Sequence, residues 1–252
     1  MTNDFDSWAE IYDLIHVDLT DDIKFYVEEA LFSNGDILEI GCGTGRVAIP
    51  MAQTGANVTA VDISEAMLKT LSSKISSKNI NLKPIKMDMR ALSLPNKFDL
   101  IIIPFHGFQS LLQYEDQSEC LESLRNHLAR DGTLIINLFV PDRNMLEQEQ
   151  DKVYFIKNVL LPGADRSITL RHSSRFDIPN QIINTKLFID FSEGGRIIES
   201  RIKDFSLRYI HRYEAEYLFK NSGFKLTNLF GDFERNNFDP YSEEMIWELT
   251  PN

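Results

Sequence analysis

The sequence has 252 residues, of which 43% are hydrophobic and 25% charged, and its formal net charge is −12. This composition is typical of a globular protein with enough apolar residues for one sizeable core. The acidic excess argues against a nucleic-acid partner or an anionic membrane surface, because both would repel the chain.

Cysteine content and terminal composition favour a cytoplasmic location. Cys42 and Cys120 form no C-x-x-C pair, so we expect neither a disulfide framework nor a zinc site. The first residues are acidic and lack the apolar core of a signal peptide. The longest apolar runs, such as residues 100–105, are too short to span a bilayer. No membrane partner is therefore expected, and the oligomeric state, monomer or homodimer, is left open.

Two helices are predicted ahead of the first strand. Apolar residues recur at helical spacing through residues 5–16 and again through 21–32. The first segment includes Tyr12, whose simplest role is that of an aromatic anchor in the core.

The stretch from Ile37 to Arg46 organises the chain and reads Ile-Leu-Glu-Ile-Gly-Cys-Gly-Thr-Gly-Arg. Its apolar start predicts a buried strand, and glycines at every second position predict a tight turn. A helix over 44–53 follows, and the next strand, 57–61, ends at Asp62. A strand, a glycine turn and a helix form the nucleotide-binding corner of a doubly wound sheet, with an acid on the next strand for the ribose.

The glycine spacing discriminates between nucleotide ligands. A dinucleotide fingerprint, G-x-G-x-x-G, would need glycine at position 46, where this chain has Arg46. Glu39 stands two residues before Gly41 and would be a poor neighbour for a pyrophosphate. The pattern E-x-G-x-G-x-G resembles motif I of the class I S-adenosylmethionine-dependent methyltransferases, and the resemblance extends over about residues 36–140.

The remaining core elements support this fold. Apolar strands alternate with helices as far as residue 139, which predicts a parallel sheet with right-handed crossovers. A late helix and two late strands resemble the closing hairpin of the family. We therefore predict an α/β fold with a doubly wound, mostly parallel, seven-stranded Rossmann-like sheet. The elements expected after Asp62 are helix 64–77, strand 81–87, strand 98–103, helix 116–129, strand 133–139, helix 213–222 and strands 224–231 and 244–250.

The sequence pattern changes near residue 150. Segments 166–176, 181–191 and 196–207 alternate in polarity and are separated by turn signals, which predicts an antiparallel meander. Residues 153–161 are a candidate fourth strand. We therefore divide the chain into a cofactor-binding core, 1–150 and 208–252, and an antiparallel insertion, 151–207. In small-molecule methyltransferases of this family such an insertion covers the active site.

The resemblance implies S-adenosyl-L-methionine as cofactor, with S-adenosyl-L-homocysteine as product. It places the ribose on Asp62 and the adenine amino group on Asp88, with the Met89 amide against the ring. It also suggests that Tyr12, followed by Asp13, closes over the cofactor. Asp88 has a simpler alternative role as a turn or helix-cap acid. The predicted cofactor-binding set is Tyr12, Gly41, Cys42, Gly43, Asp62, Ile63, Met67, Asp88, Met89 and Phe105.

His106 is the predicted catalytic residue. It directly follows strand 98–103 at the ligand end of the sheet, where it can take a proton from the acceptor or orient it. Tyr12 is the alternate candidate. No metal is expected, because the sequence lacks an H-x-x-E-H or C-x-x-C signature.

The predicted function is methyl transfer from S-adenosylmethionine to a nitrogen or oxygen atom of a small molecule. One alternative is a methyltransferase acting on RNA or protein, which the basic insertion favours: residues 166–212 hold nine Arg or Lys and five Asp or Glu. Those arginines are either solvated or hold an anionic substrate group. A second alternative is a non-catalytic, S-adenosylmethionine-binding partner subunit. A nicotinamide-dependent dehydrogenase is the weakest reading.

Overall fold

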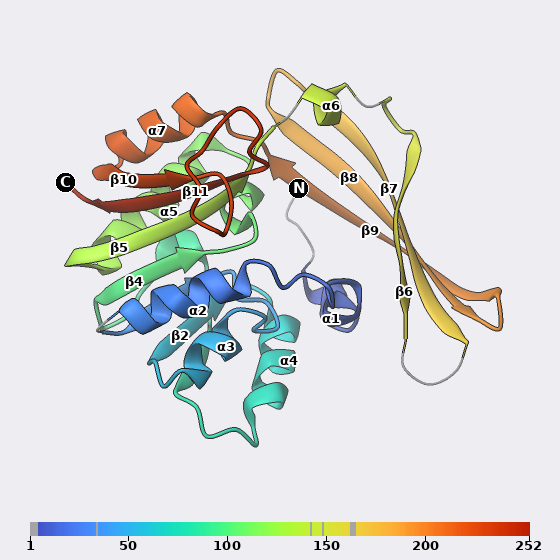
Figure 1. The fold of residues 1–252 in the computed structure, drawn as a ribbon, viewed down its shortest axis with the longest axis horizontal. Coiled ribbons are helices and arrows are strands. Elements are labelled where there is room, and N and C mark those ends of the chain that lie inside the picture. The colour runs from blue at the N-terminus through green and yellow to red at the C-terminus, as the bar shows by residue number, and fades with distance from the viewer. Residues whose placement is uncertain (1–4, 34, 142, 148, 162–164) are drawn as a thin grey trace.

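The computed structural model describes residues 5–33, 35–141, 143–147, 149–161 and 165–252. It consists of a seven-stranded sheet covered by helices on both faces and a separate four-stranded antiparallel sheet beside it (Figure 1). Both parts agree with the fold predicted from the sequence.

The large sheet has the strand order β10-β11-β5-β4-β1-β2-β3. Neighbouring strands from β5 through β3 are parallel, and β11 runs antiparallel to both β5 and β10. The carboxyl ends of the parallel strands and the amino end of β11 therefore lie at the same end of the sheet. The strands are β1 (Ile37–Ile40), β2 (Val58–Asp62), β3 (Leu82–Lys86), β4 (Phe98–Ile103), β5 (Leu128–Phe139), β10 (Phe224–Phe230) and β11 (Glu244–Pro251).

Successive residues of the central strands point to opposite faces of the sheet, and both faces are buried. Leu38 and Ile101 belong to a cluster with α5 and α7, whereas Ile37 and Leu100 belong to a cluster with α2, α3 and α4. This double burial explains why the strands read as continuous apolar runs. The helices are α2 (Ile23–Phe32), α3 (Ala48–Gln53), α4 (Glu65–Ile75), α5 (Tyr114–His127) and α7 (Arg212–Asn221).

Two predicted helices differ from the observed ones. The helix expected over 5–16 is divided into η1 (Asp6–Trp8) and α1 (Tyr12–Ile15). The helix expected from Thr44 begins four residues later, at Ala48, because Gly43 and Gly45 have positive φ angles of 53° and 84° that a right-handed helix excludes. The other short helical turns are η2 (Met89–Ala91), η3 (Gly107–Ser110) and α6 (Arg143–Leu146).

The second sheet is formed by β6 (Val153–Leu160), β7 (Arg166–Asp177), β8 (Ile182–Glu193) and β9 (Arg196–Arg208), paired in that order. It lies on the side to which the parallel strands point (Figure 1). Trp8 and Ile11 of the N-terminal segment join Ile168 and Ile189 of this sheet and Met67 of α4 in one apolar cluster. The N-terminal segment thus connects the two sheets. Within the described chain, no helix is long and apolar enough to cross a membrane.

Substitution of Gly45 by alanine should destabilise the fold more than the same substitution at Gly55. Both glycines have positive φ, 84° and 97°, so either alanine costs about 1–2 kcal/mol of backbone strain. A Cβ on Gly45 would also lie 2.3 Å from Leu71 Cδ1, whereas one on Gly55 meets nothing within 4 Å. We expect Gly45→Ala to lower the unfolding free energy by about 1–3 kcal/mol more than Gly55→Ala, because of this overpacking. Urea unfolding measures both, and equal losses would contradict the assigned clash.

Candidate active site

The glycine turn after β1 presents an open backbone surface at the carboxyl edge of the sheet. Gly41 and Gly43 have positive φ angles of 69° and 53°. A Cβ built on either residue meets nothing within 4 Å, so a ligand can approach the main chain there. The Cys42 side chain is instead buried, and burial raises the pKa of its thiol well above the usual range. Cys42 is therefore positioned to contribute main-chain atoms rather than a reactive sulfur.

Asp62 stands at the end of β2 with its carboxylate fixed by backbone donors. Gly43 N donates to Oδ2 at 2.7 Å, and Ser64 N donates to Oδ1 at 2.8 Å. Burial raises the pKa of Asp62, and these donors oppose that rise. Each oxygen keeps a lone pair for a further donor, such as a ribose hydroxyl. Ile63, next in the chain, is 54% exposed and offers an apolar surface beside it.

Asp88 has a local structural role. It caps η2, accepting a hydrogen bond from Arg90 N at 2.9 Å, and its Oδ2 lies 2.6 Å from Arg90 Nη2. The Arg90 guanidinium also contacts Asp116 and lowers the pKa of Asp88. This geometry matches the helix-cap alternative. Contacts of Asp88 and Met89 with adenine stay predictions.

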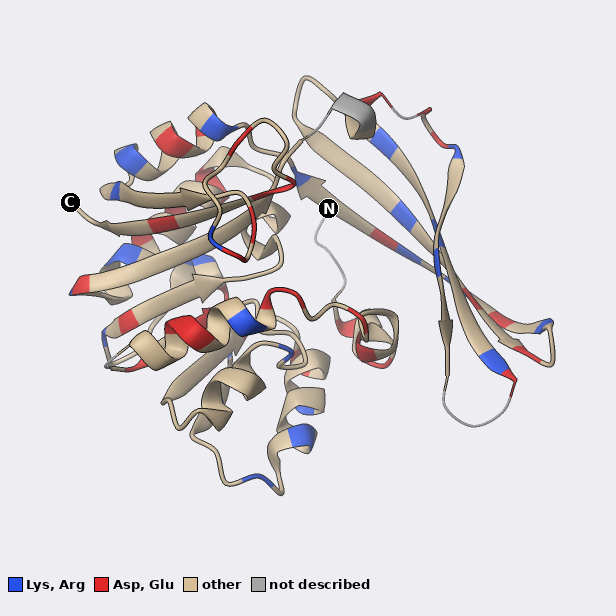
Figure 2. Cartoon of the chain, in the orientation of Figure 1, with Lys and Arg blue, Asp and Glu red and all other residues tan. Residues whose placement is uncertain are grey.

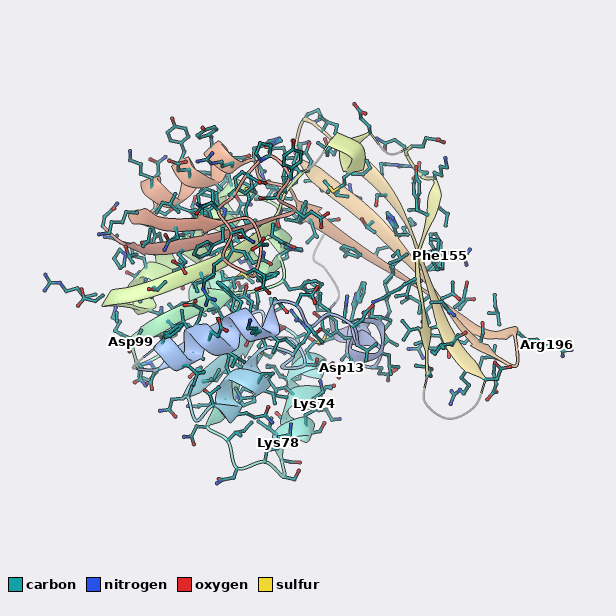
Figure 3. The ribbon with its side chains drawn as sticks, in the orientation of Figure 1. Asp13, Lys74, Lys78, Asp99, Phe155 and Arg196 are labelled. Atoms are coloured by element: carbon teal, nitrogen blue, oxygen red, sulfur yellow. The ribbon has the colours of Figure 1, made fainter. Side chains whose placement is uncertain are left out.

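The N-terminal segment is tied to the glycine turn by Asp13. Its Oδ1 accepts a hydrogen bond from the Thr44 hydroxyl at 2.6 Å, and its Oδ2 lies 2.5 Å from Lys74 Nζ (Figure 3). The neighbouring Tyr12 is half-buried near Arg46, and desolvation raises the pKa of Tyr12 to about 12. The closing of Tyr12 over the cofactor stays a prediction. Met67 is 3% exposed within the N-terminal cluster, so an adenine contact would need that packing to open.

Arg46 joins the glycine turn to the start of α2. Its guanidinium donates two hydrogen bonds to Asp22, at 2.5 and 2.7 Å, and lies 5.3 Å from the ring centre of Phe105. The nearby Glu39 is 1% exposed, and its Oε2 has no hydrogen-bond partner among the described residues. Burial raises the pKa of Glu39 well above its usual range, and the charge of Arg46 opposes that rise. Sequence reasoning used Arg46 solely to exclude a dinucleotide and missed this role.

His106 follows β4, at the carboxyl ends of the parallel strands, and has a strained backbone conformation. Phe105 and His106 have positive φ angles of 48° and 61°, which is uncommon for non-glycine residues. His106 Nε2 is 2.9 Å from Glu244 Oε2, and Asn137 Nδ2 donates to that same oxygen at 2.7 Å. Sequence reasoning missed Glu244 and Asn137. The available signal was that β11 is antiparallel, so its first residue lies beside the carboxyl ends of the other strands.

A cavity of about 830 Å³ opens beside this cluster. The loop between β10 and β11 forms much of its wall and carries many of its acidic residues (Figure 2). Seven of its lining residues are acidic, and none of the described lining residues is Lys or Arg. The cavity is therefore suited to a cationic group. Its acidic residues are Asp21, Asp22, Asp232, Glu234, Asp239, Glu243 and Glu244.

The arginines of the second sheet that sequence reasoning considered as anion ligands have carboxylate partners. Arg171 pairs with Asp190, and Arg201 lies 2.6 Å from Glu199 and 3.4 Å from Glu10. These pairs favour a structural role over recognition of an anionic substrate group.

Comparison with known proteins shows which proteins this chain resembles. A methyltransferase-domain model matches residues 37–132. The chain is 26% identical to the putative methyltransferase YqeM of Bacillus subtilis, over 97% of this chain and 96% of that protein. It superposes on the CcbJ methyltransferase of Streptomyces caelestis with a TM-score of 0.84 and 25% identity, over 100% of this chain and 99% of that one. These matches support the resemblance to class I S-adenosylmethionine-dependent methyltransferases, in sequence over residues 37–132 and in fold over the whole chain.

A third comparison concerns the cofactor. S-adenosylmethionine-bound CalS10, an amino pentose methyltransferase from Micromonospora echinaspora, matches with a TM-score of 0.69 and 17% identity, over 90% of this chain and 87% of that one. The predicted fold is thus confirmed, and the cofactor bound by CalS10 is the one that the sequence resemblance predicts for this chain. The open glycine turn and the buried Asp62 carboxylate suit the adenosine contacts predicted from the sequence, and those contacts stay predictions.

Asp62→Ala should weaken binding of S-adenosylhomocysteine by about 2–4 kcal/mol, because hydrogen bonds to a charged acceptor are the stronger kind. Isothermal titration calorimetry measures this loss. Asp99→Ala is the control. Asp99 lies near the amino end of β4, far from the glycine turn (Figure 3), so its substitution should leave the affinity for S-adenosylhomocysteine unchanged. Wild-type affinity in Asp62→Ala, with folding verified by thermal denaturation, would contradict the assigned ribose contact.

Proposed function

We propose that this methyltransferase methylates a nitrogen or oxygen atom of a small molecule, and that a cationic amine is the acceptor it takes best. The observation that carries the proposal is the acidic cavity beside Phe105 and Glu244. Carboxylates at its wall attract an ammonium group and raise its local concentration. CalS10, an amino pentose methyltransferase, acts on a substrate class that is consistent with such an acceptor.

We infer that Asp62 and the turn Gly41–Gly45 hold the adenosine, with Tyr12 closing over the cofactor from the N-terminal segment. When bound, S-adenosylmethionine supplies a methyl group already activated on a sulfonium. The chain must then align the acceptor and exclude water. The second sheet, on the side to which the parallel strands point, is proposed as the cover of the acceptor site (Figure 1).

His106 is proposed to take the proton that a protonated amine must lose before it can act as a nucleophile. An ionised Glu244 accepts the Nε2 proton of His106, which leaves the lone pair on Nδ1. That nitrogen is then the base, and the carboxylate stabilises the imidazolium that forms. Asn137 holds the carboxylate in place.

His106→Ala should lower kcat by roughly 10²–10⁴, the range for a positioned acid or base. The affinity for S-adenosylhomocysteine should stay near the wild-type value, because His106 belongs to the acceptor side. Steady-state kinetics and calorimetry measure the two quantities. Tyr12→Phe in the same assays tests the alternate base. An undiminished kcat in His106→Ala would eliminate the base role and leave alignment as the source of catalysis.

Amine recognition is tested with labelled S-adenosylmethionine and matched pairs of small acceptors that differ in an amine or a hydroxyl. We expect a higher kcat/KM for the amine of each pair. The double variant Glu234→Gln, Glu243→Gln should raise KM for the amine with little change in kcat, since it removes attraction and not chemistry. Glu122→Gln, at an exposed position of α5, is the control and should leave KM unchanged. Methylation of RNA or protein alone would overturn the proposal, as would equal turnover of both members of every pair.

A further inference from the structure

The second sheet has two edge strands, β6 and β9, and no described strand pairs with the outer side of either. The sheet order β6-β7-β8-β9 leaves the outer side of β9 unpaired among the described strands. Three isoleucines there are exposed: Ile197 by 62%, Ile198 by 57% and Ile202 by 58%. Arg196, at the tip of the β8–β9 hairpin, marks how far this end projects from the core (Figure 3). Such an edge offers unpaired backbone N–H and C=O groups as a template for another strand.

The sequence of this edge is complementary to itself. If two copies of β9 run antiparallel with Ser200 facing Ser200, each Glu199 lies opposite the other copy's Arg201. Ile198 then lies opposite Ile202, so charged and apolar pairs both match. Such cross-strand pairs stabilise antiparallel strands, whereas like charges directly opposite destabilise them.

Neighbouring registers do not match in this way. A shift of two residues in one direction places Glu199 opposite Glu199 of the other copy. The same shift in the other direction places Arg201 opposite Arg201. A shift of one residue would place residues whose N–H and C=O groups point away from β8 opposite residues whose groups point toward it. Strand residues alternate in this respect with a period of two, so such a register could not form the backbone hydrogen bonds. A single register about Ser200 therefore satisfies both the backbone and the side chains.

The other edge strand of this sheet offers no such match. Lys157 is the sole charged residue within β6, Val153–Leu160, and its amino group is bound to Asp18 of the N-terminal segment. The β6 edge thus has no acid to face a lysine of a second copy. Self-pairing is favoured at β9.

We propose that two copies of this chain associate through β9, with the strands antiparallel about Ser200, to give one continuous eight-stranded sheet. The apolar row formed by Phe188 and its cross-strand neighbour Ile202 would continue into the partner's Ile198. The bulge that makes Ile198 an extra residue opposite β8 ends the regular pairing there. The contact is short, so the dimer dissociates on dilution.

Charge reversal and mixing test this register on the full chain by sedimentation velocity over a concentration series. Wild type should form a concentration-dependent dimer. Glu199→Arg or Arg201→Glu alone puts two like-charge pairs in the interface and should raise the dimer Kd by about tenfold or more. An equimolar mixture of the two single variants should restore dimers, since each substituted side chain then faces one of opposite charge on the other chain. The double variant should also restore them.

Glu122→Arg on α5 and Lys225→Glu on β10 are matched controls. Each makes the same change in net charge at an exposed position of the core, and each should leave the dimer Kd unchanged. Dimers restored in the mixture also show that both single variants are folded. Wild type that is monomeric at every concentration would overturn the proposal. So would single variants that dimerise like wild type, or single variants whose mixture stays monomeric.

Discussion

The candidate site depends on one buried ion pair. Arg46 brings a guanidinium into contact with Asp22 at the entry to α2, beside Glu39 and against the Phe105 ring. Breaking such a pair would leave an uncompensated charge in a poorly solvated place, which is far more costly than losing an exposed pair. One side chain therefore fixes the glycine turn, the amino end of α2 and the loop after β4 relative to one another. Those are the segments between which cofactor and acceptor are proposed to meet.

Local signals made the glycine turn and the position of Asp62 predictable from sequence. Three alternate glycines after an apolar run specify the turn, and Asp62 follows at the end of the next strand. Because the carboxyl ends of parallel strands share one edge, the fold alone brings Asp62 and His106 to the same side. The exact start of α3 was not predictable to the residue, because the glycines ahead of it adopt angles that their lack of a side chain merely permits.

Pairings between distant segments were beyond sequence reasoning. Nothing near His106 in the chain indicates Glu244, which lies 138 residues away, and nothing near Arg46 indicates Asp22 as its partner. These contacts are set by strand order and by the antiparallel direction of β11, so they can be found only from the three-dimensional arrangement of the sheet. The division of the helix predicted over 5–16 has a similar cause. Trp8 and Ile11 pack against residues of the second sheet instead of forming one continuous helical face.

In the proposed function, the acidic cavity and the pair of His106 and Glu244 meet opposite requirements of amine methylation. Carboxylates attract an ammonium group, but the same field stabilises its protonated form, which has no lone pair to give. A site that only bound the cation would therefore hold the acceptor in an unreactive state. In the proposed mechanism His106, whose Nε2 is bonded to Glu244, uses its other ring nitrogen to take that proton. Under the proposed function, recognition by charge thus makes a base necessary, and His106 is next in the chain to Phe105 and bonded to Glu244, both of which line the acidic cavity.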